Sequence, residues 1–174
     1  MRGESVRPAP GATAGRPHAR GVRPVRVASR ILFAGPGQVR PPAVRLVVYL
    51  LAAAGVVLTV WSGVIHIRLW SEGYEAIPTI GPLFLAQGVG SLVIAAALVV
   101  IRRVVVMAIG AASLAATAAG LLLSAYVGLF GYRESLAVPD ARTSLVIEFS
   151  GAAVLLLAAV IVAVAAVRGA EPGR

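Results

Sequence analysis

The sequence predicts an all-α membrane protein, in which four transmembrane helices form an up-down-up-down bundle behind a disordered N-terminal tail. The chain has 174 residues, of which 59% are hydrophobic and only 13% are charged, whereas soluble domains average about 25% charged residues. Its mean hydropathy is +0.89. The apolar residues are concentrated in long uninterrupted runs, the pattern of helices that cross a lipid bilayer.

Residues 1–43 differ from the rest of the chain. They contain seven of the eleven prolines, are rich in arginine, glycine and alanine, and show no helical period. Such a segment cannot bury enough apolar surface to offset its conformational entropy, so we expect it to be a disordered cytoplasmic tail. The alternative, that it is upstream sequence of a GC-rich gene, stays open, and we assign no function to it.

The rest of the chain divides into four apolar spans and a short end. We expect one transmembrane domain, residues 44–168, followed by a short cytoplasmic tail, residues 169–174. Its spans lie at about 46–67, 81–101, 104–130 and 144–167.

The boundaries between the spans follow from length and from breaks in the sequence. A single helix over residues 81–130 would be about 75 Å long, more than twice the thickness of the hydrocarbon core, so the chain must fold back. Arg102 and Arg103 mark this turn. Pro139 breaks the chain before the fourth span, where Asp140 or Thr143 is a candidate helix cap.

The arginines determine the predicted orientation. All sixteen basic residues are arginine, and thirteen of them fall on the side of both termini and the Arg102–Arg103 turn. The opposite side has Arg68, Arg133 and Arg142 alone. By the positive-inside rule we expect a multi-pass protein of a bacterial plasma membrane with both termini in the cytoplasm. The net charge of +9 is thereby explained by topology and anionic lipid, and no nucleic-acid partner is predicted.

The composition excludes several kinds of chemistry. The absence of cysteine excludes disulfides, thiolate catalysis and thiolate metal sites. His66 is the single histidine outside the tail, so one protomer cannot build a haem site with two axial histidines. Ser62 precedes His66 by one turn, the spacing of a nucleophile and a base, but no oxyanion hole accompanies it. We predict no catalytic residue, no metal site and no cofactor, and we lean against an enzyme.

Small residues indicate where the helices should approach one another. Lipid provides no hydrophobic reason for helices to associate, so close packing at small side chains and interhelical hydrogen bonds must hold them together. The third span has such residues at four-residue spacing, and we expect these stripes to pack closely: Gly120, Ser124, Gly128 and Ala108, Ala112, Ala116. Gly88, Ser91 and Ala95 form a shorter stripe on the second span.

Few polar residues lie at membrane depth, and the topology brings them to one level in the outer leaflet. This candidate polar layer consists of His66, Arg68, Gln87, Tyr126 and Glu148. A carboxylate inside a bilayer must be neutral or paired, so Glu148 should face inward, with His66 and Arg68 as partners. Two interpretations stay open: a ligand or proton site, or a structural tie between the first and fourth spans. The loop over residues 71–78 is either a lid on this layer or a simple connection.

One segment resembles a known group of proteins. His66-Ile67-Arg68-Leu69-Trp70, followed by Tyr74 and by Ile77 to Leu85, is similar to an uncharacterised four-span integral membrane protein family of high-GC actinobacteria. The similarity covers residues 45–167 in hydropathy and only this region in residue detail. It implies a plasma-membrane location and the same bundle, and it brings no reaction and no site.

The function hypotheses are accordingly general. The first is a non-catalytic accessory or envelope-associated protein. The alternative is a module that binds a small ligand, a quinone or a lipid, in the outer-leaflet polar layer, and a transporter subunit ranks third because no span is broken near its midpoint. The expected partner is the lipid bilayer, with other membrane proteins or a second copy of the chain left open.

Overall fold

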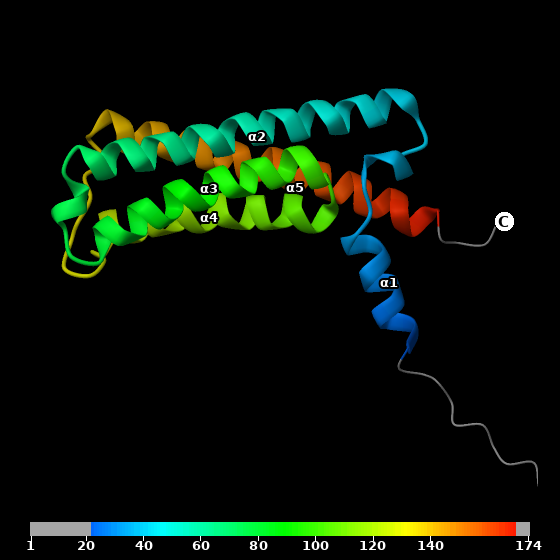
Figure 1. Cartoon of the computed structure of the whole chain (residues 1–174), viewed down its shortest axis with the longest axis horizontal. Coiled ribbons are helices and arrows are strands. Elements are labelled where there is room, and N and C mark those ends of the chain that lie inside the picture. The colour runs from blue at the N-terminus through cyan, green and yellow to red at the C-terminus, as the bar shows by residue number, and fades with distance from the viewer. Residues whose placement is uncertain (1–21, 170–174) are drawn as a thin grey trace, which may run out of the picture.

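The computed structural model describes residues 22–169, in which all regular structure is helical apart from one isolated β-bridge. Four helices are long and apolar enough to cross a membrane: α2 (Pro42–Ser71), α3 (Ile80–Ile101), α4 (Val104–Tyr126) and α5 (Pro139–Arg168). The helix α1 (Val22–Leu32) and the single turns η1 (Pro36–Gln38) and η2 (Tyr74–Ala76) complete the described part. The predicted all-α bundle with alternating helix directions is confirmed (Figure 1).

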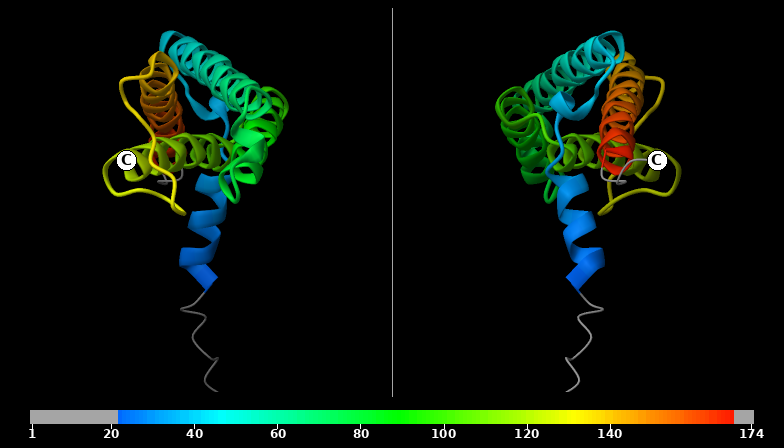
Figure 2. Two further views of the ribbon diagram at one scale, coloured as in Figure 1. Left: turned by 90° about the vertical axis from the view of Figure 1, so that its left-hand side faces the viewer. Right: turned by 90° about the vertical axis from the view of Figure 1, so that its right-hand side faces the viewer.

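The four long helices form a ring in which each packs on two neighbours. Helix α2 contacts α3 and α5, and α4 contacts α5 and α3 (Figure 2). The α3–α4 connection is the turn predicted at the arginine pair, because Arg102 has left-handed backbone (φ 44°) and Arg103 is extended. We name the end of the bundle at this turn the arginine end. The opposite end, with the connections of residues 72–79 and 127–138, is the loop end.

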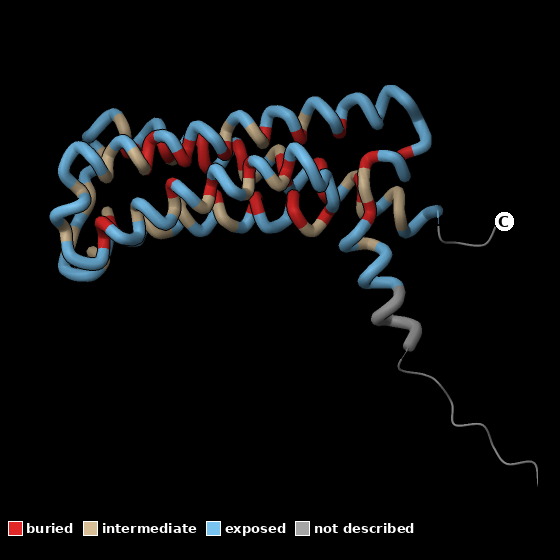
Figure 3. The backbone as a smooth tube through the Cα atoms, in the orientation of Figure 1, coloured by how far each residue is buried: buried red, intermediate tan, exposed pale blue. Residues whose placement is uncertain are grey.

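The core lies along the inner faces of the helices, where buried positions face one another (Figure 3). Met107, Leu114 and Leu155 are fully buried there. The predicted stripe on α3 is also confirmed, since Gly88, Ser91 and Ala95 are all buried. A Cβ atom on Gly88 would lie 2.5 Å from Ile67 Cγ1, so α2 and α3 approach closely at this glycine.

The alanine stripe predicted to pack on α4 is wrong. Ala108, Ala112 and Ala116 are exposed, and the residues that face the core belong to a different face: Met107, Gly110, Ala111, Leu114 and Ala118. A helix that is apolar all round carries no periodic signal for its inner face. The larger side chains Met107 and Leu114 fill the interior together with other small residues, and the predicted alanines are left on the surface.

The ends of α4 and α5 also differ from the predicted spans. Helix α4 stops at Tyr126, and the chain turns through Gly128 and Gly131, which both have positive φ, closed by a bridge between Leu129 and Tyr132. Helix α5 begins at Pro139, with Val138 as its N-cap and no side-chain cap bond. The two predicted caps are wrong: Thr143 donates its hydroxyl to the Pro139 carbonyl, and Asp140 pairs with Arg68.

The predicted disordered tail differs from the structure over residues 22–43, while residues 1–21 lie outside the described part. Helix α1 and the turn η1 occupy this stretch. Ala34 and Val39 are buried against the bundle, and the Ala34 carbonyl accepts a hydrogen bond of 3.0 Å from the Val104 amide at the start of α4. A few buried residues and one backbone bond therefore fix this segment to the arginine end.

Candidate functional site

A cavity of about 340 Å³ lies between the four helices in the half of the bundle toward the loop end. It forms because α3 and α4 separate in this half. A Cβ atom on Gly110 would lie 3.4 Å from Ile94 and Leu98 of α3, whereas a Cβ atom on Gly120, three turns further along α4, would meet no atom within 4 Å. Gly120 lines the cavity.

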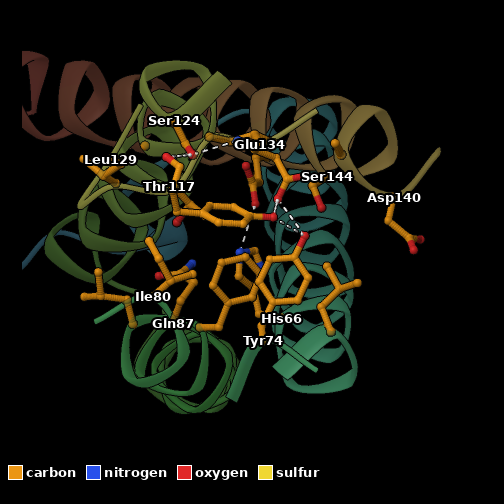
Figure 4. A pocket seen from close by; sticks show the side chains of 18 of the residues that line it. His66, Tyr74, Ile80, Gln87, Thr117, Ser124, Leu129, Glu134, Asp140 and Ser144 are labelled. Carbon is orange, nitrogen blue, oxygen red and sulfur yellow. Dashed lines mark hydrogen bonds and ion pairs between the residues drawn. The ribbon is translucent and has the colours of Figure 1, made fainter. Parts of the chain in front are cut away.

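The surface of the cavity wall is mostly apolar, and polar side chains interrupt it on both sides, among them Gln87 of α3 and Thr117 of α4. Helices α3 and α4 contribute Leu83, Phe84 and Leu121 among others. Helices α2 and α5 contribute His66 and Ser144, which are labelled in Figure 4, and also Glu148. The cavity thus offers apolar surface and several hydrogen-bonding groups to the same bound molecule.

Glu148 is the central polar group of this site. Its residue is 0% exposed. Its Oε1 atom accepts a hydrogen bond of 3.3 Å from the Ser62 hydroxyl, and its Oε2 atom has no hydrogen-bond partner among the described residues. The expectation that Glu148 faces inward is met, and one of its buried oxygen atoms is left without a hydrogen bond beside the cavity.

His66 is held beside Glu148 by its own helix. Its Nδ1 atom lies 2.8 Å from the Ser62 carbonyl one turn earlier, and since a carbonyl only accepts, Nδ1 carries the hydrogen. Its Nε2 atom lies 3.9 Å from Glu148 Oε1, and its ring packs on Phe84 with centroids 5.1 Å apart. Ser62 therefore orients both groups, the carboxyl with its hydroxyl and the imidazole with its carbonyl.

The structure brings together three of the five predicted polar residues. Gln87 joins His66 and Glu148 in the cavity wall, where its amide nitrogen donates to the Ser91 hydroxyl at 3.1 Å. Arg68 lies outside the cavity and pairs with Asp140 at 2.6 Å and with Glu72 at 3.9 Å. The predicted Arg68–Glu148 pair is therefore not formed. Tyr126 is 71% exposed and does not line the cavity.

A roof of two loops covers the cavity at the loop end, and most of it was missed from the sequence. Tyr74 donates a hydrogen bond of 2.6 Å to Glu134 Oε2, and the Tyr132 hydroxyl shares its single hydrogen between the same oxygen and the Tyr74 hydroxyl, each at 3.2 Å. The Tyr74 ring stacks on Phe84, with centroids 4.5 Å apart. The lid interpretation of residues 71–78 thus has a structural basis in Tyr74.

The roof tyrosines are strongly held in their neutral form. Burial raises the pKa of Tyr74 well above its usual value of 10.0, and the hydrogen bond to Glu134 raises it further. Burial also raises the pKa of Tyr132. Both phenols therefore act as hydrogen-bond donors to the Glu134 carboxylate. In the sequence, the glycines of the Gly128–Gly131 turn are the feature that could have indicated the roof, because this turn brings Tyr132 and Glu134 back over the bundle.

Neither metal-ligand groups among the described residues nor similarity to known proteins assigns a role to the site. Among the described residues, no group of three or more His, Cys, Asp or Glu side chains could hold a metal ion. Comparisons with protein-family models, with curated proteins and with solved structures found nothing that matches the chain. The resemblance to the actinobacterial four-span family stays a prediction, and the function has to be argued from the cavity.

Proposed function

We propose that this chain is a membrane-embedded binding protein for a lipid-soluble small molecule with a hydrogen-bonding head group, of the quinone or lipid class. The volume of about 340 Å³ lies within the range of pockets that hold small organic ligands. The apolar body of the ligand lies against Leu83, Phe84 and Leu121, and its head group bonds to Glu148. The geometry supports this function better than a purely accessory role.

The observation that carries the proposal is the free Oε2 atom of Glu148. A buried polar atom without a hydrogen bond is unfavourable by about 1–3 kcal/mol, and Glu148 is both fully buried and in the cavity wall. A protonated carboxyl donates to a quinone or ester carbonyl, and an ionised one accepts from a hydroxyl. A bound head group in either form satisfies this atom.

The way in is from the bilayer, between α3 and α4. Leu83 of α3 and Ala116 of α4 both line the cavity and are exposed on the bundle surface, so they mark an opening toward lipid. The tyrosine roof covers the end that faces water. A ligand that is already dissolved in the membrane has direct access, whereas a water-soluble one does not, which supports the lipid-soluble class.

The arginine distribution supports the sidedness of the site. Six arginines whose side chains the structure describes lie at the arginine end: Arg30, Arg40, Arg45, Arg102, Arg103 and Arg168. With this end in the cytoplasm, both termini are cytoplasmic and the cavity opens into the outer leaflet of a bacterial plasma membrane. The protein would then bind its ligand on the side of the membrane that faces the envelope.

The experiment is native mass spectrometry of the mildly solubilised protein, with an absorption spectrum of the same sample. We expect a stoichiometric bound molecule in the wild type that is absent from the Glu148→Gln variant, with the unfolding temperature largely kept. Glu75→Gln is the matched control, because Glu75 is an exposed acid at the same end and does not line the cavity. This variant should keep the molecule.

A second variant separates ligand binding from a structural role of Glu148. Gly120→Leu places a side chain where no atom lies within 4 Å of a Cβ, so it fills the cavity without displacing the core. It should lose the bound molecule with the fold intact. If the wild type has no stoichiometric ligand, or if Gly120→Leu keeps it, the cavity is not the site and the accessory, envelope-associated role becomes the better hypothesis.

A further inference from the structure

Helix α1 projects from the arginine end, away from the bundle. Figure 1 shows it directed away from the long axis of the four membrane helices, and Figure 2 shows the same departure in the view down that axis. A helix that turns away from the direction of the membrane-spanning helices does not continue across the bilayer, so it can lie along the membrane surface. Its depth relative to the bilayer is then set by the point at which it is attached.

That attachment is at the α3–α4 turn, where the apolar spans end. The segment after α1 is fixed by the hydrogen bond from the Val104 amide to the Ala34 carbonyl, and by a second one from the Arg103 guanidinium to the Phe33 carbonyl. Ala34 and Pro36 are buried beside it. The end of α1 is therefore held level with the last turn of α3, at the boundary between hydrocarbon and water.

The described part of α1 has an apolar and a basic surface. Val27 and Leu32 of α1 are exposed, as is Arg30, and the exposed Phe33 follows directly after the helix. At 100° per residue, Arg30 and Leu32 lie about 200° apart around the helix axis. One face of the helix can therefore meet acyl chains while the arginine faces the head groups, which is the arrangement of an interfacial amphipathic helix.

Among the residues that the structure describes, the charged side chains near α1 are all arginines. No carboxylate of the described residues lies at the arginine end, since all five are in the loop connections or in the half of α5 nearest the loop end: Glu72, Glu75, Glu134, Asp140 and Glu148. The guanidinium groups of Arg30, Arg40, Arg45 and Arg168 have no hydrogen bond or ion pair with another described residue. This layer of positive charge has no counter-charge within the described part of the protein.

We propose that α1 lies in the membrane interface at the arginine end and that Arg30, with Arg40 and Arg45, binds the phosphates of anionic phospholipid head groups. Charge complementarity supports lipid as the partner, because the free arginines lie at the depth where head-group phosphates are found. The exposed Leu32 and Phe33 also suit an acyl region better than a soluble anionic partner. This site is independent of the cavity at the loop end.

The test uses the absence of native cysteine. A nitroxide attached to a Leu32→Cys variant of the full chain is a unique reporter, and its collisions with oxygen and with a water-soluble nickel reagent measure its depth. The protein is reconstituted into vesicles of phosphatidylcholine alone, or of phosphatidylcholine and phosphatidylglycerol in equal parts. We expect the label to be deeper in the anionic vesicles than in the neutral ones. This shift in depth should be largely lost when Arg30→Gln, Arg40→Gln and Arg45→Gln are combined in the labelled chain.

A control variant and three contrary outcomes make the test decisive. The matched control is Arg133→Gln, an exposed arginine of the loop end, which should leave the shift unchanged. A label that stays in water in both vesicles, or that is equally deep in both, overturns the proposal. So does a shift that inorganic phosphate reproduces in neutral vesicles, because the partner would then be a soluble anion and not a lipid.

Discussion

Tyr74 and Glu134 are joined by a hydrogen bond of 2.6 Å that links two loops 60 residues apart in the chain. The Tyr132 hydroxyl also lies within hydrogen-bond distance of both groups, so the Glu134 carboxylate interacts with two phenols over the cavity. The roof is attached to the bundle beneath it, because the Glu134 amide donates to the Ser124 hydroxyl of α4 at 3.2 Å. These contacts hold the loop end together where α3 and α4 separate.

A first prediction concerns the phenol of Tyr74. The Tyr74→Phe variant keeps the ring that stacks on Phe84 and loses the hydrogen bond to Glu134, so we expect the free energy of unfolding to fall by about 0.5–1.5 kcal/mol. Tyr126→Phe is the control, since Tyr126 is largely exposed. Unfolding of the detergent-solubilised protein measures both. Equal stabilities of the two variants would show that the roof bond contributes nothing.

A second prediction concerns the pH dependence of the same phenol. The pKa of Tyr74 is raised above 10.0 in the folded protein, so the unfolded chain loses this proton first as the pH rises. The stability contributed by the neutral phenol is therefore complete below about pH 10 and declines above it. The advantage of wild type over Tyr74→Phe should be constant from neutral pH to about pH 10 and then shrink. An advantage that grows above pH 10 would contradict the assignment.

Hydropathy was sufficient to predict the fold because the bilayer imposes the length of each span. The four helices and the turn at Arg102 follow from apolar length and from two charges that cannot lie in hydrocarbon. The inner face of each helix was less predictable. In α4 nearly every residue is apolar, so no period distinguishes the buried Leu114 from the exposed Ala112.

The candidate site was predictable in part, for a reason of chemistry. A carboxyl such as Glu148 has to face inward at membrane depth, because contact with lipid would leave it without water and without a polar partner. Arg68 and Tyr126 lie near helix ends, where a side chain can reach water or the interface instead. The roof was not predicted because it forms only in the tertiary structure, where the turn through Gly128 and Gly131 brings Tyr132 to Tyr74.

A third prediction tests the close approach of α2 and α3. Alanine at Gly88 would place its Cβ 2.5 Å from Ile67 Cγ1 and 3.2 Å from the Gly63 carbonyl oxygen, so the helices must move apart. We expect Gly88→Ala to destabilise the bundle by about 1–3 kcal/mol, as overpacking does. Gly90→Ala, on the same helix, meets no atom within 4 Å and should be neutral or slightly stabilising. A loss of stability in both variants would indicate a general effect of alanine on α3.

A fourth prediction concerns the orientation from which the outer-leaflet site is argued. Because the chain has no cysteine, single variants report sidedness without background. Glu75→Cys lies in the exposed connection at the loop end and Gln38→Cys in the exposed turn at the arginine end. In intact cells a membrane-impermeant maleimide should label the first and not the second, and both should react once the membrane is permeabilised. The opposite pattern would place the cavity in the cytoplasmic leaflet, and its ligand would then have to be sought among molecules that reach the protein from the inside.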